Sequence, residues 1–310
     1  MTLLYYDPRF LDHETGQHPE RAERLRQVAR HLQRTGLDQR CGRPDWQPLG
    51  RDRTERVHEA AYLRQLEDFT KAGGGRIEQD TLVSSASFDV ASLAAGAVCD
   101  AVDRVVGGEH DQALCLIRPP GHHALPRGAM GFCLLNHVAL AASVATEELD
   151  LDRVLIIDWD VHHGNGTQDV FWTDERVGFL SIHRWPFYPG TGDKSETGSG
   201  PGLGATRNLP VEFGTPRKTY MECFENELQE FAARTKPQLI LLSAGFDSHR
   251  DDPVGSLGLE TEDFRTLTQA VIDVARTYAN GRLVSVLEGG YNPGVLAGCV
   301  EQHLATLLEA

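Results

Sequence analysis

The chain has 310 residues, of which 40% are hydrophobic and 24% charged, as in a globular protein with a sizeable core. Its formal net charge of −15 argues against a nucleic-acid-binding protein, which would carry basic patches. An acidic surface suits a cationic partner, but it is also a common means of staying in solution. No apolar stretch approaches the ~20 residues of a membrane span, so no membrane partner is expected.

The cysteines and the N-terminus indicate the cellular compartment. Six cysteines are scattered without a Cys-x-x-Cys pair, and several lie in apolar runs. Such cysteines are typical of reduced core residues in an intracellular protein. The N-terminus lacks the basic and apolar regions of a secretory signal. The sequence therefore predicts a cytoplasmic protein, and it leaves open whether the chain forms an oligomer.

Predicted strands and helices alternate along the chain. In order, we expect a strand at 3–6, helices at 18–35, 54–72 and 88–106, a strand at 113–117 and a helix at 135–149. The second half continues with strands at 154–158 and 177–182, a long loop at 184–207, a helix at 215–234, a strand at 238–244, a helix at 261–279, a strand at 282–287 and a helix at 293–308. This alternation predicts an α/β fold, a mostly parallel sheet with helices on both faces. Because no repeat or linker is visible, residues 1–310 are expected to form one domain.

The stretch from Val154 to Gly166 contains the strongest candidate site. Its apolar run is typical of a strand buried on both faces, and it breaks into Asp158-Trp-Asp160-Val-His162. Because side chains alternate along a strand, the two carboxylates and the imidazole would share one side if the extended conformation continued that far. The alternative is an Asp that caps a helix and a His in a loop, but three ligand-type side chains in register indicate a site.

Polar side chains also follow three other predicted strands, at the point where each strand ends. These segments are Arg118-Pro-Pro-Gly-His-His123, Gly245-Phe-Asp247 and Glu288-Gly-Gly-Tyr291. In a parallel sheet the carboxyl ends of the strands lie on one edge, so groups far apart in the sequence can meet there. The sequence therefore predicts one site built from four strand ends.

Asp160, His162 and Asp247 offer oxygen and nitrogen atoms as metal ligands. Three protein ligands with an open position for water are typical of a catalytic zinc site. Because the set contains no thiolate, Fe(II), Mn(II) and Co(II) remain alternatives. Water bound to such a metal has a pKa near ~7 and is a nucleophile at neutral pH.

His122 and His123 lie in an irregular Pro-Gly turn, where both can reach the edge of the sheet. One of them is expected to act as a general base. Tyr291 follows two glycines, which permit unusual backbone angles and close approach. Its hydroxyl is a candidate donor to a developing oxyanion, and the alternative is an aromatic ring that only packs.

Together these residues resemble the histone deacetylase family, which includes acetylpolyamine amidohydrolases and acetoin-utilisation proteins. The matching segments run in family order over nearly the whole chain: RPPGHHA at 118–124, GFCLLN at 131–136, DWDVHHGNGT at 158–167, YPGTG at 188–192, SAGFD at 243–247 and EGGY at 288–291. The GNGT form resembles the class II branch. The resemblance implies the arginase-deacetylase fold, an α/β fold that agrees with the alternating strands and helices.

The resemblance implies a zinc-dependent amidohydrolase that removes acetyl, or a related acyl group, from lysine side chains of peptides or proteins. Asp160, His162 and Asp247 would be the zinc ligands. Two alternatives stay open. One is a deacetylase of small acetylated amines such as acetylpolyamines, and the other is a catalytically silent module that binds acyl-lysine.

The same resemblance gives roles to the histidines and the tyrosine. His123 would be the general base that activates water and then protonates the leaving amine. His122, paired with Asp158, would be its electrostatic neighbour, and Tyr291 would polarise the acetyl carbonyl beside zinc. Where some relatives pair the base with an aspartate, this sequence has Asn165, which should stabilise the charged form of His123 less than a carboxylate would.

Further matches imply a narrow tunnel for the acyl-lysine stem. Phe132 and Tyr188 would be its walls, Gly131 would lie at its floor, and Asp80 would hold the substrate backbone at its rim. Polyamine-selective relatives can carry an acidic residue after Asp-Pro near the tunnel mouth. This sequence has Val254 there, which argues against a polyamine substrate.

The resemblance also implies structural potassium ions, bound largely through backbone carbonyls. The matching positions are Asp158, Ser181 and Ile182 for one ion and Phe171, Asp174 and Val177 for a second ion.

Overall fold

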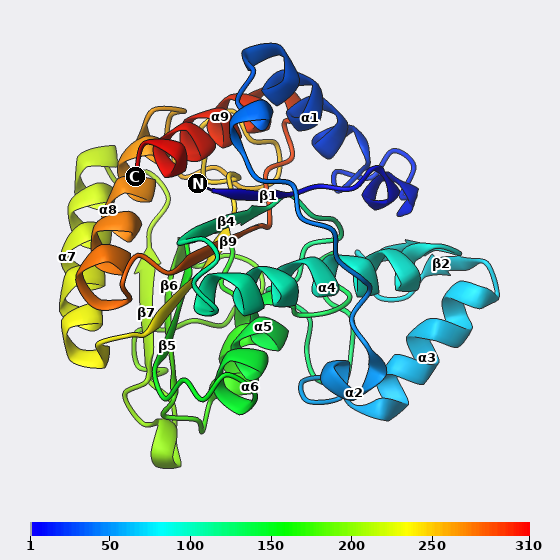
Figure 1. Ribbon diagram of the computed structural model, residues 1–310, viewed down its shortest axis with the longest axis horizontal. Helices are drawn as coiled ribbons and strands as arrows, with labels where there is room; N and C mark the ends of the chain where they lie inside the picture. Colours follow the sequence, from blue (N-terminus) through cyan, green and yellow to red (C-terminus); the bar gives the residue numbers. More distant parts are fainter. Residues whose placement is uncertain (1) are drawn as a thin grey trace.

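The computed structural model describes residues 2–310, and within them seven parallel strands form one sheet (Figure 1). The strand order is β1-β4-β9-β8-β5-β6-β7. The bounds are β1 Leu3–Tyr5, β4 Gln112–Cys115, β5 Val154–Asp158, β6 Val177–Arg184, β7 Thr206–Val211, β8 Leu239–Ala244 and β9 Leu283–Leu287. The strands β4, β5, β8 and β9 are buried along their whole length, as expected for apolar strands in the middle of a parallel sheet.

Helices cover both faces of the sheet (Figure 1). One layer contains α1 (Glu23–Thr35), α9 (Pro293–Glu309), α8 (Asp263–Tyr278) and α7 (Arg217–Thr235), packed in this order. The other layer contains α4 (Ser87–Val106), α5 (His137–Glu147) and α6 (Asn165–Phe171), with α2 (Arg51–Thr54) and α3 (Ala60–Lys71) beside them. Short 3-10 helices are η1 (Pro8–Asp12), η2 (Asp38–Arg40) and η3 (Gly200–Gly202). The predicted fold class is confirmed.

Several short elements, α6 among them, were not predicted from the sequence. The edge strand β7 contains Asn208 and Pro210 and pairs with β6 on one side, so it lacks the apolar run of a central strand. The hairpin of β2 (Gly74–Arg76) and β3 (Leu82–Ser84) is short and begins at two glycines. The expected helix at 54–72 is in fact two helices, α2 and α3.

Strand register brings the predicted segments to one edge of the sheet. Asp158 at the end of β5 lies beside Ser243 of β8 and Ser181 of β6. Ala244 of β8 lies beside Leu287 of β9, and β9 pairs with β4 on its other side. The loops that follow β4, β5, β8 and β9 therefore leave the sheet side by side. Within residues 2–310, none of the helices has the length and apolarity needed to cross a membrane.

Candidate active site

Asp160, His162 and Asp247 converge at this edge of the sheet, and all three are buried. One ligand atom from each lies within 4.8 Å of the others. His162 Nδ1 is 3.0 Å from Asp160 Oδ1 and 3.2 Å from Asp247 Oδ2. The structure therefore brings together the three side chains that the sequence singled out as metal ligands.

The cause of this convergence differs from the one expected. Strand β5 ends at Asp158, so side-chain alternation along an extended chain does not reach His162. Instead the chain forms two consecutive turns, each stabilised by an aspartate side chain. The Asp160 N–H donates to Asp158 Oδ1 at 3.0 Å, and the His162 N–H donates to Asp160 Oδ1 at 2.9 Å. Aspartate side chains that accept nearby backbone amides stabilise turns of this kind.

The charges of this cluster are suited to a bound cation. Burial raises the pKa of Asp247 to about 7, and the charge of Asp160 adds to the rise. Burial disfavours the charged form of His162, but the two carboxylates outweigh it and raise the pKa of His162 to about 9. Asp247 Oδ2 is buried and accepts no hydrogen bond from residues 2–310. A metal cation would satisfy this oxygen and balance the carboxylates.

Close backbone approach keeps the space between the carboxylates free. A Cβ atom at Gly289 would lie 2.2 Å from Asp247 Oδ2 and 2.5 Å from Asp160 Oδ2. The Gly289 N–H donates to Asp160 Oδ2 at 2.8 Å. Any larger residue at this position would fill the cradle between the two carboxylates. The donor atoms and this cradle fit a divalent cation that prefers nitrogen and oxygen ligands.

His122 and His123 have different partners and different protonation states. His122 Nδ1 lies 2.9 Å from Asp158 Oδ2. Burial opposes the charge of His122, but Asp158 and Asp160 outweigh it and raise its pKa to about 10. Burial, followed by the charges of His122 and His162, holds the pKa of His123 well below its usual value. These surroundings therefore favour the charged form of His122 and the neutral form of His123, with 4.0 Å between ring centroids.

The hydrogen bond of His123 selects its basic nitrogen. His123 Nδ1 lies 2.6 Å from Asn165 Oδ1. Because an amide oxygen only accepts, Nδ1 carries the proton and Nε2 has a free lone pair. His123 lines the cavity beside His162, so this ring can take a proton from a group bound near the cluster.

A cavity of about 130 Å³ leads to the carboxylate cluster. Its lining residues are Asp80, His123, Gly131, Phe132, His162, Phe187, Tyr188, Val254 and Tyr291. The cavity therefore contains every residue that was expected to form the tunnel. The ring of Phe132 meets Tyr291 edge-on at 5.6 Å, and Tyr188 meets His123 edge-on at 5.3 Å.

The rim beside Asp80 is held by side chains that the sequence did not indicate. The Phe132 N–H donates to Thr81 Oγ1 at 3.1 Å, and Phe132 has a left-handed φ of 69°. His18 Nε2 lies 3.0 Å from the Asp80 carbonyl oxygen. Burial raises the pKa of the Asp80 carboxyl, and the neighbouring Glu78 adds to the rise.

Two further residues hold the Tyr291 backbone and were missed as functional positions. Asp252 Oδ2 accepts the Tyr291 N–H at 2.6 Å. Arg24, fully buried in α1, donates to the Gly290 carbonyl at 2.6 Å, and its guanidinium lies 4.9 Å from the Tyr291 ring centroid. The only sequence signal was the Asp252-Pro253 pair, because Arg24 lies 266 positions from its acceptor.

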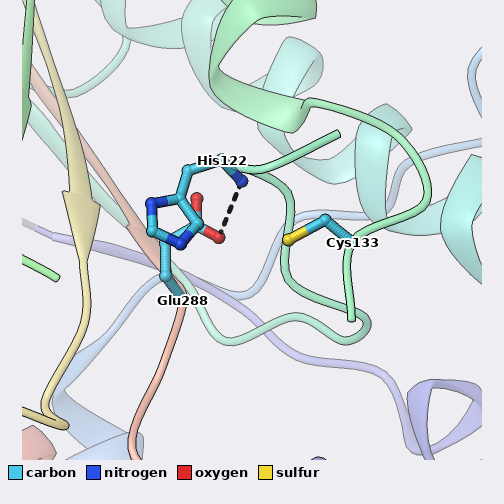
Figure 2. Close-up of side chains that lie close together, drawn as sticks. All are labelled: His122, Cys133 and Glu288. Atoms are coloured by element: carbon cyan, nitrogen blue, oxygen red, sulfur yellow. Dashed lines mark hydrogen bonds between the residues drawn. The ribbon is translucent and has the colours of Figure 1, made fainter. Parts of the chain in front are cut away.

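Glu288 links three strand ends through one buried carboxylate. Its Oε2 accepts the N–H groups of Gly121, at 2.6 Å, and His122, at 3.2 Å. The Ser243 hydroxyl donates to Glu288 Oε1 at 3.1 Å. Figure 2 shows Glu288 beneath His122, with the dashed bond to the His122 backbone and with Cys133 beside them. The carboxylate thus fixes the turn that carries both histidines.

The predicted potassium positions are placed as follows. Asp158 and Ser181 lie opposite each other in the β5–β6 register, with Ile182 next along β6. Phe171 ends α6, Val177 begins β6, and Asp174 between them forms a salt bridge with Arg176 at 2.6 Å. The expected potassium ligands are mainly backbone carbonyls, which strand register and side-chain contacts do not test. The potassium sites therefore stay a prediction.

Comparison with known proteins identifies the family. Residues 18–307 match the histone deacetylase domain. The chain is 38% identical to a probable deacetylase of Archaeoglobus fulgidus, covering 100% of this chain and 89% of that protein. It is 37% identical to a histone deacetylase-like amidohydrolase of Pseudomonas aeruginosa, covering 91% of this chain and 74% of that protein. The crystal structure of the HDA15 HD domain superimposes with a TM-score of 0.94 at 34% identity, covering 99% of this chain and 88% of that one.

The fold and the site thus define a deacetylase-type amidohydrolase with the arginase-deacetylase fold. The chain belongs to the histone deacetylase family.

Proposed function

We propose that this protein is a zinc-dependent deacylase that removes acetyl, or a related short acyl group, from lysine side chains. The observation that carries the proposal is the buried cluster of Asp160, His162 and Asp247 at the end of a narrow cavity that also contains His123 and Tyr291. Within the family, this arrangement is suited to hydrolysis of an amide whose stem enters through the cavity.

The three clustered side chains would hold the zinc ion. When bound there, zinc supplies a Lewis acid and lowers the pKa of a coordinated water towards ~7. The chain itself keeps Asp160 ionised, because the charges of His122 and His162 outweigh burial and lower the pKa of its carboxyl. It also excludes bulk water, since these side chains are at most 6% exposed.

His123 moves the proton. Its Nε2 accepts a proton from the attacking water and later donates it to the leaving lysine amine. The bond from Nδ1 to Asn165 Oδ1 keeps the ring in the required tautomer and orientation. The neighbouring His122 stays positively charged through its pair with Asp158, which favours return of the proton from His123 to the product.

Tyr291 would stabilise the oxyanion. Burial raises the pKa of its phenol well above the usual value, so the hydroxyl keeps its proton and can donate a hydrogen bond. Asp252 and Arg24 bind the 290–291 backbone and so hold the Tyr291 ring in the cavity. Their hydrogen bonds do not involve the Tyr291 hydroxyl.

The cavity supports an acyl-lysine stem as the substrate. Its walls are the aromatic rings of Phe132, Phe187 and Tyr188, which suit an apolar methylene chain. Val254 also lines the cavity, so that position offers no carboxylate to a cationic amine. Asp80 lines the cavity and would accept backbone N–H groups of a peptide.

Deacetylation of a small acetylated amine is the second candidate. It is favoured by the acidic pair of Asp80 and Glu78, because Asp80 lines the cavity and could bind a distal ammonium group. Rates on acetyl-lysine peptides and on acetylated polyamines, measured side by side, separate the two. A higher kcat/KM on the polyamines than on the peptides would favour deacetylation of small amines over lysine deacylation.

The proposal is tested on peptides that carry formyl-, acetyl-, propionyl- and butyryl-lysine. We expect hydrolysis of at least one short acyl peptide, loss of activity after chelation, and recovery on addition of zinc. Binding of these peptides without hydrolysis, with or without metal, would instead indicate a silent acyl-lysine binding module. The potassium ions and the cytoplasmic location stay predictions.

A further inference from the structure

We propose that Arg184 is a positioning residue that ties two walls of the tunnel together and thereby sets the affinity for the acyl-lysine stem. The inference rests on the proposed deacylase function. Arg184 ends β6 and lies outside the metal cluster and the cavity lining. Nothing in its sequence context marks it as part of a site.

The guanidinium of Arg184 contacts two aromatic rings. Its Cζ is 4.1 Å from the ring centroid of Phe187 and 4.4 Å from that of Phe213. Phe187 lines the cavity and stacks on His162, with 5.3 Å between ring centroids and 17° between ring planes. Phe213, by contrast, is 65% exposed, which is unusual for a phenylalanine. We infer that the exposed Phe213 ring stabilises the guanidinium in its position beside Phe187.

The same guanidinium also contacts the loop that contains Val254 and Gly255. Its Nη1 donates to the Gly255 carbonyl oxygen at 3.0 Å. The preceding residue, Val254, lines the cavity, and Asp252 accepts the N–H groups of both Val254 and Gly255. One side chain thus connects the wall formed by Phe187 to the wall formed by Val254.

An arginine is needed for this geometry. Its flat guanidinium can contact a ring on each face and still donate from its edge. Its Nε is buried and has no hydrogen-bond partner among residues 2–310, so the grip comes from the ring faces and from Nη1. A lysine ammonium could hold one of these partners at a time.

The contacts predict an effect on substrate binding more than on the chemical step. The walls contact the stem equally before and during the reaction, so loosening them removes uniform binding, which raises KM and leaves kcat nearly unchanged. The Tyr291 backbone is held separately by Asp252 and Arg24. We therefore expect Arg184→Met to raise KM for an acetyl-lysine peptide roughly ten-fold, as for the loss of one hydrogen bond from a charged donor, with kcat changed less than about three-fold.

A matched control is available on the same protein. Arg234 lies 4.7 Å from the Phe231 ring centroid and also donates to a backbone carbonyl, that of Gly204, in a region away from the cavity. Arg234→Met removes the same kinds of contact and should leave KM unchanged. Phe213→Leu removes only the exposed ring, so it should raise KM by roughly three-fold, and it should have no further effect in the Arg184→Met background.

Amide hydrogen exchange on the zinc-loaded protein measures the link without any activity. Segments 185–192 and 252–258 should exchange roughly ten-fold faster in Arg184→Met and at the wild-type rate in Arg234→Met. Unchanged exchange in both segments, an unchanged KM, or additive effects of Arg184→Met and Phe213→Leu would overturn the proposal. Absence of deacylation in the wild-type protein would refute the proposed function instead, and the exchange measurement would still decide whether Arg184 ties the walls.

Discussion

Replacement of Glu288 by alanine is expected to release the turn that carries His122 and His123. The carboxylate is completely buried, and it is the acceptor for the backbone N–H groups of Gly121 and His122 (Figure 2). Alanine would leave both donors without a partner in a region that water does not reach. Glutamine at the same position keeps one oxygen towards the two amides and can donate from its nitrogen to the Ser243 hydroxyl.

The expected loss of stability follows from the two backbone N–H groups that would be left without an acceptor. An unsatisfied buried donor costs about 1–3 kcal/mol, so Glu288→Ala should lower the free energy of unfolding by about 2–6 kcal/mol. Burial, only partly offset by the His122 charge, already raises the pKa of Glu288 to about 7, so a neutral side chain is well tolerated there. Glu288→Gln should therefore cost less than about 1.5 kcal/mol.

Urea unfolding of the wild type and both variants measures these differences, with hydrogen exchange of segment 119–124 as a local readout. The alanine variant should exchange faster in this segment, and the glutamine variant should stay close to the wild type. Equal destabilisation by both substitutions, or a fully stable alanine variant, would refute the view that the two amide bonds fix this turn.

Two other predictions concern the reaction, and a third concerns the pH dependence of stability. Tyr291→Phe should lower kcat on an acetyl-lysine peptide by about 10²–10³, as for one lost oxyanion donor, with an unchanged circular-dichroism spectrum; a normal turnover would remove Tyr291 from the mechanism. Asn165→Asp should raise the pKa of His123 and move the acidic limb of the kcat/KM profile upward by about 1–2 pH units, whereas an unmoved limb would mean that His123 is not the titrating base. Burial lowers the pKa of His58 to about 4, and its Nε2 accepts the Asn136 N–H at 2.9 Å, so the folded state disfavours the protonated ring. The contribution of neutral His58 to the free energy of unfolding is complete above pH ~6.5 and should decline as pH falls towards 4, by up to about 1.4 kcal/mol per pH unit. Thermal unfolding of His58→Gln at several pH values should show a weaker dependence of stability on pH.

The parts of the fold that the sequence predicted are those with a continuous apolar signal. Strands β5, β8 and β9 are runs of Val, Leu and Ile, and buried parallel strands need such runs. The edge strand β7 (Thr206–Val211) begins inside the predicted loop at 184–207, which is rich in Gly, Pro, Ser and Thr, and its remainder carries Asn208 and Pro210 instead of a continuous apolar run. Helix α6 is only seven residues long and begins inside the glycine-rich motif at 164–167, so its helical period is too short to recognise.

The candidate site was predictable as a set of residues, but its supporting contacts were not. Asp160, His162 and Asp247 each follow a recognisable strand, and the parallel topology then brings them together. Glu288 was expected near the site only as the start of the segment that carries Tyr291, and Arg24 is an ordinary charged residue of a predicted helix. Their functions depend on burial and on partners 266 and 167 positions away, which no local pattern reveals.

The same limit applies to the tunnel. Phe132 and Tyr188 were expected as walls from their motifs, whereas Phe187 was not, although it stacks directly on His162. A phenylalanine beside a tyrosine in a loop gives no sign of which ring faces the cavity. The direction is set in part by Arg184, whose position is known only from the folded chain.

The most direct test of this account is a crystal structure of the zinc-loaded protein, with anomalous data collected on both sides of the zinc absorption edge. We predict one strong peak per chain, in contact with side-chain atoms of Asp160, His162 and Asp247, and its disappearance in Asp247→Ala. A protein that binds no zinc, or a peak that touches none of these three side chains, would contradict the account.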